Sequence, residues 1–259
     1  MRHHLLFFCI AMHSLVGAAE PSPVHAAQCE GAYPKHLQGV CSNQRDAIYW
    51  SFTDYLVKTD LDGKIQQKLQ VANHHGDLCH VDGKVYVAVN LGKFDLPAGK
   101  EDSWVYVYDA VFLKELARHR VPELVHGSGG IAYHDGKFIV VGGLTPEDKD
   151  NILYEYDTNF RFVTAHPMGS GYTLMGIQTA TWSDGSWWFG CYGKPQVTLR
   201  ADSQFKSSGN WVFNASWGLE SLSDGRFLVG IDKNEPGVGH IGKVVLAEKD
   251  EQLGLRLVK

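Results

Sequence analysis

The stretch HVDGKVYVAVN, residues 80–90, decides the fold because it reads as a complete β-hairpin. Asp82 and Gly83 form the two-residue turn that hairpins favour, and valine and tyrosine follow at strand spacing. The hairpin returns as YHDGKFIVVGG (133–143), WSDGSWWFGCY (182–192), LSDGRFLVGID (222–232) and, in degenerate form, SNQRDAIYWSF (42–52). The aspartates of the four clear copies recur at intervals of 40 to 53 residues, so the chain is built from internal repeats.

A second signature follows each hairpin: a strand that ends in an acidic residue, and then a short turn. Its copies are YLVKTDLDGK (55–64), WVYVYDAVF (104–112), ILYEYDTNF (152–160), VTLRADSQF (197–205) and, more weakly, KVVLAEKDE (243–251). Each unit therefore supplies four short strands, and one such sheet cannot cover both of its own faces. Five sheets packed radially can, which predicts an all-β, five-bladed β-propeller with four antiparallel strands in each blade.

One segment of the chain and one competing fold have to be reconciled with a propeller. VFLKELARHR (111–120) has helical periodicity, but it occupies the fourth-strand position of its unit and is predicted to be an outer strand. A two-sheet sandwich is the competing fold, and it does not explain the repeat. The inner strands of the propeller are expected near residues 36–41, 75–80, 128–133, 176–182 and 217–222.

The first 27 residues are predicted to be a signal peptide rather than part of the fold. Arg2 precedes the apolar run LLFFCIAMHSLVG, which is too short to span a bilayer, and small residues follow it. Cleavage after Ala19 or after Ala27 fits these small residues. Residues 28–259 then form a single propeller domain, exported to the periplasm or secreted.

The composition of the chain limits the classes of partner that we expect. The net charge is −5 with no block of basic residues, so a nucleic-acid partner is not expected. No later segment is apolar enough to hold the protein in a membrane, and we expect a monomer. Export permits disulfides, but no C-x-x-C spacing exists. Cys41 and Cys79 are predicted not to bridge, because they lie on inner strands of neighbouring blades.

Histidines stand at the start of three predicted inner strands: His36, His75 (with His74 beside it) and His126. Each could simply cap a backbone group or contact water, but equivalent positions in successive blades converge near the propeller axis. We therefore expect these three to share one pocket and, with Gln178, to form a possible site for a divalent metal. His80 and His134 lie beside hairpin turns and are expected at the opposite end.

Long loops should frame the same pocket, namely residues 90–103, 142–151 and 232–242. They and the neighbouring strand ends supply the predicted substrate contacts Asn90, Lys93, Tyr192, Lys194, Trp217, Lys233 and His240. The predicted catalytic residues are His75, Tyr172 and Glu220, with His75 or Tyr172 abstracting a proton. GVGHIG (237–242) matches a dinucleotide-binding motif but runs into a strand rather than a helix, so no nucleotide cofactor is expected.

The chain resembles the five-bladed propeller group that includes arabinan-degrading glycosidases and plant-type glutaminyl cyclotransferases. It also resembles a set of secreted bacterial propeller proteins without an assigned activity. The segments HHGDLC, HGSGGIA, GYTLMGIQTA and WWFGCYG carry this resemblance. The glutamate-rich inner segment of the cyclotransferases is missing, and the inner strands offer only Asp77 and Glu220 where the glycosidases have three carboxylates.

Three functions follow as hypotheses. The leading one is a secreted lyase or hydrolase that acts on a small polar substrate, such as a carbohydrate fragment, in a histidine-lined axial funnel. The second is a non-catalytic propeller that binds a glycan or a protein by its loop-rich face. The third is aminoacyl cyclisation of the cyclotransferase type, which would depend on Glu220 alone.

Overall fold

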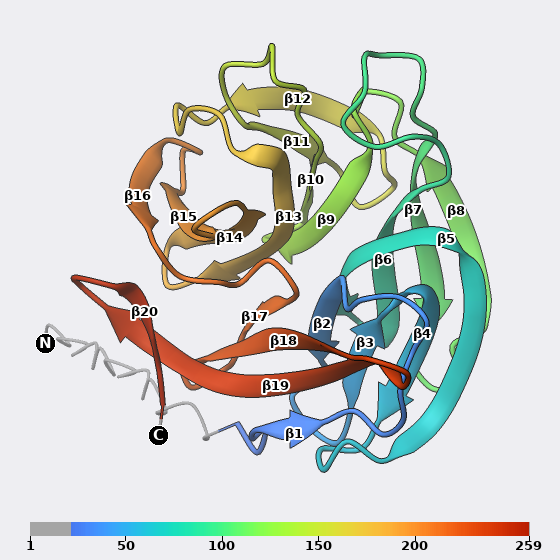
Figure 1. Cartoon of the computed structure of the whole chain (residues 1–259). Coiled ribbons are helices and arrows are strands. Elements are labelled where there is room, and N and C mark those ends of the chain that lie inside the picture. The colour runs from blue at the N-terminus through green and yellow to red at the C-terminus, as the bar shows by residue number, and fades with distance from the viewer. Residues whose placement is uncertain (1–21, 259) are drawn as a thin grey trace, which may run out of the picture.

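The structure is a computed structural model that describes residues 22–258, so most of the predicted signal peptide lies outside the described residues. Every regular element between residues 22 and 258 is a β-strand, which confirms the predicted all-β class. Within the same range, no helix is long and apolar enough to cross a membrane. The strands form twisted antiparallel sheets around a central axis (Figure 1).

Blades one and two form one continuous seven-stranded sheet. The long strand β5 (Ile65–Val81) makes this possible, because its first part pairs with β4 as the outer strand of blade one and its last part pairs with β6 as the inner strand of blade two. The other strands are β2 (Gly39–Ser42), β3 (Ile48–Ser51), β4 (Thr53–Thr59), β6 (Lys84–Asn90), β7 (Ser103–Asp109) and β8 (Glu115–Arg120). Strand β8 is the outer strand predicted for residues 111–120.

The remaining three blades are separate sheets. Blade three contains β9 (Ser128–His134), β10 (Lys137–Gly142), β11 (Ile152–Tyr156) and β12 (Phe162–Pro167). Blade four contains β13 (Leu174–Ser183), β14 (Ser186–Tyr192), β15 (Val197–Asp202) and β16 (Ser207–Trp211). Blade five contains β17 (Leu219–Ser221), β18 (Phe227–Glu235), β19 (Gly239–Asp250), β20 (Gly254–Leu257) and β1 (Ala27–Gln28). The inner strands β2, β5, β9, β13 and β17 contact one another in that cyclic order, which closes the ring.

The start of the described chain completes blade five. Strand β1 pairs with β19, with Ala27 opposite Val244, and the side chain of Val24 is buried in the core that includes Trp50. Cleavage of a signal peptide after Ala27 would remove these contacts. Of the two predicted cleavage sites, only the one after Ala19 leaves the described fold complete.

The repeated hairpin turns have the backbone that the sequence predicts. Asp82, Asp135 and Asp184 have φ angles of 47°, 48° and 43°, and each following glycine is also left-handed. These angles are those of type I′ turns, whose twist matches that of the flanking strands. The turn at Asp224 differs, because only Gly225 is left-handed there and Leu222 N bonds Arg226 O across a longer loop.

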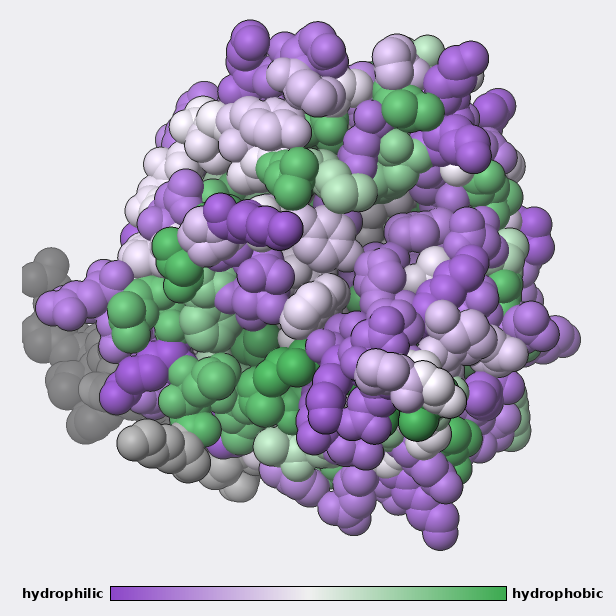
Figure 2. All heavy atoms as spheres, viewed as in Figure 1, coloured by the Kyte–Doolittle hydropathy of each residue, from purple (hydrophilic) through white to green (hydrophobic). Residues whose placement is uncertain are grey.

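Packing between blades fills the core. Trp187 and Trp188 are neighbours on β14 and point to opposite faces of blade four, as adjacent strand residues must. Trp187 packs with Ile139 of blade three, and Trp188 packs with Phe227 of blade five. Both tryptophans therefore serve inter-blade packing. On the surface, hydrophobic residues gather at the lower left of Figure 2, over β19 and β20, where Leu253, Leu257 and Val258 are exposed.

All four cysteines of the described chain are buried free thiols: Cys29, Cys41, Cys79 and Cys191. Cys41 and Cys79 do not bridge, as predicted. Burial raises the pKa of both thiols, and the carboxyl groups of Glu220 and Asp77 near the axis raise it further. These thiols are therefore held in the unreactive protonated form.

Candidate functional site

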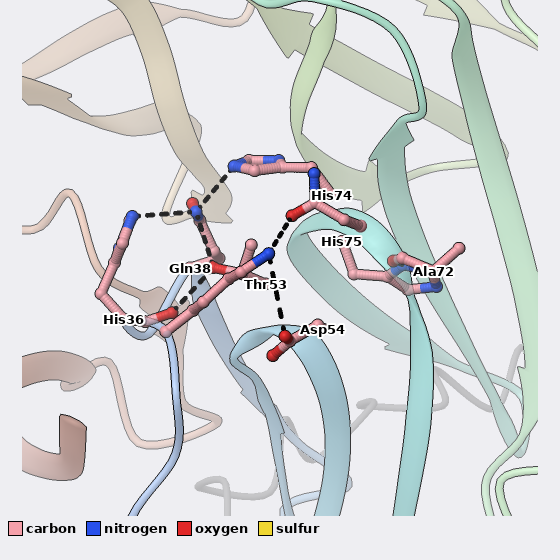
Figure 3. A network of polar contacts seen from close by, with 9 residues as sticks. His36, Gln38, Thr53, Asp54, Ala72, His74 and His75 are labelled. Atoms are coloured by element: carbon pink, nitrogen blue, oxygen red, sulfur yellow. Dashed lines mark hydrogen bonds and ion pairs between the residues drawn. The ribbon is translucent and has the colours of Figure 1, made fainter. Parts of the chain in front are cut away.

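A polar network lies where the inner strands of blades one and two begin (Figure 3). The buried amide of Gln38 is its centre, with Nε2 lying 3.3 Å from His36 Nε2 and 2.8 Å from His74 Nε2. His36 Nδ1 donates to the Leu37 carbonyl at 2.9 Å, so its Nε2 is the nitrogen that accepts from the amide. The amide thus links two imidazoles at the same end of the axis. We call this end the mouth.

His74 is poised to stay neutral. Burial, and then the neighbouring His36, lower the pKa of His74 to about 4. Its Nδ1 is buried and has no hydrogen-bond partner in the described part of the chain. Its ring stacks on Phe94 of the loop after β6, with 6.0 Å between ring centres. The mouth therefore contains the imidazole of His74, whose Nδ1 makes no hydrogen bond within residues 22–258, beside the aromatic ring of Phe94.

A second histidine of the mouth is oriented by a carboxylate. His240 Nδ1 lies 2.7 Å from Asp232 Oδ2, and Asp232 Oδ1 accepts a hydrogen bond from Leu37 N at 2.9 Å. The long β18–β19 hairpin brings Asp232 and His240 together across its two strands. The His240 and His36 rings are 6.0 Å apart, which joins this pair to the network around Gln38. In the tautomer that donates its Nδ1 proton to Asp232 in a hydrogen bond, Nε2 of His240 carries the lone pair.

Two further groups with shifted pKa values belong to the mouth. The hydroxyl of Tyr192, at the end of β14, is buried without a hydrogen-bond partner among residues 22–258. Burial, and then the charges of Asp232 and Asp95, raise the pKa of Tyr192. Burial also raises the pKa of Asp95 to about 7. The mouth therefore combines a lone-pair nitrogen, a hydroxyl that stays protonated and a carboxyl that is partly protonated at neutral pH.

The structure brings His36, Tyr192 and His240 together at the mouth, but it moves His75 elsewhere. His75 is fully buried, with Nδ1 bonded to Ala72 O at 2.7 Å and Nε2 bonded to the Tyr108 hydroxyl at 2.8 Å. Adjacent residues of a strand face opposite ways, so the predicted role shifts by one residue to His74. His75 is a core residue of blade two, and both of its ring nitrogens are hydrogen-bonded within the protein.

The predicted metal ligands do not assemble. His126 lies apart from His36, with Nδ1 bonded to Leu96 O at 2.8 Å and Nε2 at 3.4 Å from Asp148. The amide of Gln178 donates to the Met175 carbonyl. Among residues 22–258, no group of three or more histidine, cysteine, aspartate or glutamate side chains is placed to hold a metal ion. The residues present therefore do not fit the predicted metal site.

The remaining predicted site residues are not part of the network around Gln38. Lys93, Lys194 and Tyr172 are exposed, and Lys233 pairs with Glu235 at 2.7 Å. The carbonyl of buried Asn90 accepts hydrogen bonds from the backbone of Gly92 and Asp102, so it holds its own loop. Trp217 packs against the core shared by blades five and one.

Glu220 lies at the other end of the inner strands. It lines a cavity of about 300 Å³ together with residues such as Cys79, Tyr133 and Trp182. Asp77 lies along β5 between this cavity and the mouth, and its buried Oδ2 accepts a hydrogen bond from Ala180 N of blade four at 3.0 Å. A side chain at Gly39 of blade one would collide with the same carboxylate. Glu220 is therefore separated from the histidines with which the sequence grouped it.

Asp232, Asp95 and His74 are parts of the mouth that the sequence did not predict. All three stood in segments that were recognised as important, namely the loops 232–242 and 90–103 and the doublet His74–His75. The sequence signal for the pair was that one long hairpin carries both an aspartate, Asp232, and a histidine, His240. Only the register of that hairpin, in which Asp232 is opposite Gly242 and Asn234 is opposite His240, shows that the two side chains meet.

Comparison with known proteins shows the fold and no more. No family model and no curated protein matches the chain. The chain is similar to a xylan β-1,4-xylosidase from Bacillus halodurans C-125, with a TM-score of 0.58 at 14% identity over 92% of this chain and 56% of the xylosidase. It is also similar to U3-55K (TM-score 0.52, 9% identity, 93% of this chain and 85% of that one). The RRP9 WD40 repeats give a TM-score of 0.52 at 10% identity, over 93% and 84% of the two chains. These neighbours support the propeller and include both an enzyme and WD40 repeats.

Proposed function

We propose that this protein is an exported glycoside-cleaving enzyme whose active site is the mouth of the propeller. The observation that carries the proposal is the Asp232–His240 pair, with a distance of 2.7 Å between Oδ2 and Nδ1. A carboxylate that fixes an imidazole in one tautomer prepares the opposite nitrogen to take up a proton. His240 takes the role of base that the sequence analysis gave to His75.

The acid in this proposal is Asp95. A carboxyl with a pKa of about 7 is still partly protonated at neutral pH, so it can donate a proton to the oxygen of a leaving sugar. His240 Nε2 would take a proton from the attacking water as the water oxygen bonds to the sugar carbon and the glycosidic bond breaks. Tyr192, whose raised pKa keeps its hydroxyl protonated, would donate a hydrogen bond to a substrate oxygen.

The surroundings suit a polar ring-shaped substrate. Phe94 and Tyr172 offer aromatic faces, of which Tyr172 is 42% exposed, and sugars commonly stack on such faces. Lys93 and Lys194 are exposed and make no ion pair within residues 22–258, so they are available to acidic sugar substituents. We therefore place oligosaccharides that contain uronic acids first in the substrate class.

The experiment is a panel of neutral and acidic oligosaccharides incubated with purified protein. New reducing ends without ultraviolet absorbance indicate hydrolysis, and new reducing ends with the absorbance of an unsaturated sugar indicate elimination. His240→Gln should lower the rate by a factor of about 10² to 10⁴, the usual contribution of a general base. The matched control is His134→Gln, because His134 stacks on Trp182 away from the mouth. Full activity in His240→Gln would overturn the assignment of the base.

One observation favours a non-catalytic alternative. Exposed apolar side chains occur on the loop after β6, just before β13 and at the start of β13, namely Leu91, Leu96, Tyr172, Leu174 and Met175. Exposed apolar residues of this kind are typical of binding faces. Binding of a glycan from the panel without any turnover would favour this second function. The cyclotransferase hypothesis is not retained, because its acid, Glu220, lies away from the mouth.

A further inference from the structure

The cavity at the far end of the axis from the mouth is a small chamber that opens to solvent. Its volume is about 300 Å³, at the lower end of the range for small-molecule sites. Four inner strands supply its walls, because Cys79, Ala132, Ala180 and Glu220 come from blades two, three, four and five. The two alanines leave space where larger side chains would fill the channel. We call this chamber the lower cavity.

Glu220 is the acidic group of the lower cavity, and nothing in the described chain neutralises it. No hydrogen bond and no ion pair joins its carboxyl to another residue between positions 22 and 258. The charged or titratable groups around it are Asp77, His80, Tyr133 and the thiols of Cys41 and Cys79. None of these is a permanent cation, and burial lowers the pKa of His80, which keeps its imidazole neutral.

An unpaired carboxyl in a low-dielectric site is costly, because burial penalises its charged form. Burial raises the pKa of Glu220 to about 8 for this reason. A ligand that carries a positive charge would remove the cost by pairing with the carboxylate. An anionic or purely apolar ligand would not.

The walls fit the same ligand. Trp182 and Tyr133 place aromatic rings at the lower cavity, and aromatic faces attract cations. The Thr181 hydroxyl oxygen accepts a hydrogen bond from Ser221 N at 3.0 Å, so its own proton is available to a ligand. Gln44 is held in place, because its Nε2 donates to Ser221 O and its Oε1 accepts from Ser223 N.

We propose that the lower cavity binds a small organic cation with a single ammonium group, and that Glu220 is its counter-ion. The ammonium group lies against the carboxylate, and a short apolar body lies against Trp182 and Tyr133. The site is separate from the mouth and does not depend on the reaction proposed there.

The test uses the full chain with n-butylammonium as the probe and 1-butanol as its neutral counterpart, in a buffer free of amines. By titration calorimetry at pH 8.5, we expect n-butylammonium to bind at least about tenfold more tightly than 1-butanol, the factor equivalent to about 1.4 kcal/mol. Glu220→Gln should lose that preference. His240→Gln should keep it, which separates this site from the mouth.

The dependence on pH gives a second readout. The ammonium stays charged throughout, whereas the Glu220 carboxyl ionises as pH rises through about 8. Binding should therefore strengthen by a factor on the order of 50 between pH 6 and pH 8.5. Three results would each overturn the proposal. The first is that n-butylammonium binds wild type and Glu220→Gln with equal affinity, and the second is that 1-butanol binds wild type as tightly as n-butylammonium does. The third is that n-butylammonium does not bind folded wild type at pH 8.5.

Discussion

Replacement of Glu220 by glutamine should make the protein more stable at neutral pH. The carboxyl has a pKa of about 8 in the folded chain against an ordinary value of 4.5, so folding at pH 7 requires either a proton or a buried charge. The difference corresponds to about 3 kcal/mol at pH 7 at most. Glu220 is partly open to the lower cavity, so we expect a gain of about 2 kcal/mol.

The sign of the pH dependence is fixed by the raised pKa. The folded state binds the proton more tightly than the unfolded state, so wild type loses stability as pH rises from about 4.5 to about 8. Glutamine does not titrate, so the advantage of the variant should be near zero at pH 4.5, large at pH 7 and largest at pH 8.5. At pH 7 the melting temperature should rise by about 4 to 8 °C, since one kcal/mol corresponds to about 2 to 4 °C at this chain length.

Urea unfolding at pH 4.5, 7 and 8.5, followed by circular dichroism, measures this effect. The matched control is Glu235→Gln, because Glu235 is a glutamate of the β18–β19 hairpin that pairs with Lys233 near the surface. It should leave the stability and its dependence on pH nearly unchanged. A gain for Glu220→Gln that is equal at all three pH values, or a loss at pH 7, would refute the reasoning, because neither result comes from an unpaired buried carboxyl.

Two further predictions concern the N-terminal strand and the thiols. A chain that begins at Gln28 should be less stable than one that begins at Glu20 by about 2 kcal/mol or more in thermal melts, because it lacks buried Val24 and half of β1. Equal stability would show that these N-terminal contacts do not stabilise blade five. In folded protein, a thiol-reactive dye should label almost none of the cysteines of the described chain, and in denaturant it should label all of them. Rapid labelling of the folded protein would contradict the burial of Cys29, Cys41, Cys79 and Cys191.

The repeat made the architecture predictable, because the Asp-Gly turn and the period of 40 to 53 residues are properties of the chain itself. The site was less predictable, because it depends on which way each side chain points. His75 was expected at the mouth, but the alternation of β5 turns it into the core and leaves His74 facing Gln38. Likewise β1, with two residues, is too short to carry a strand pattern, and only the pairing of Ala27 with Val244 identifies it.

Asp77 explains how one narrow axis can hold two separate sites. Its carboxylate lies against Gly39 of blade one and accepts a hydrogen bond from Ala180 of blade four. It therefore fixes three inner strands relative to one another and fills the channel between the mouth and the lower cavity. Burial raises the pKa of Asp77, as it does for Glu220, but only Asp77 has a hydrogen bond from a neighbouring blade to offset that cost. The contrast argues that Asp77 serves the fold, and that the unpaired carboxyl of Glu220 serves a ligand.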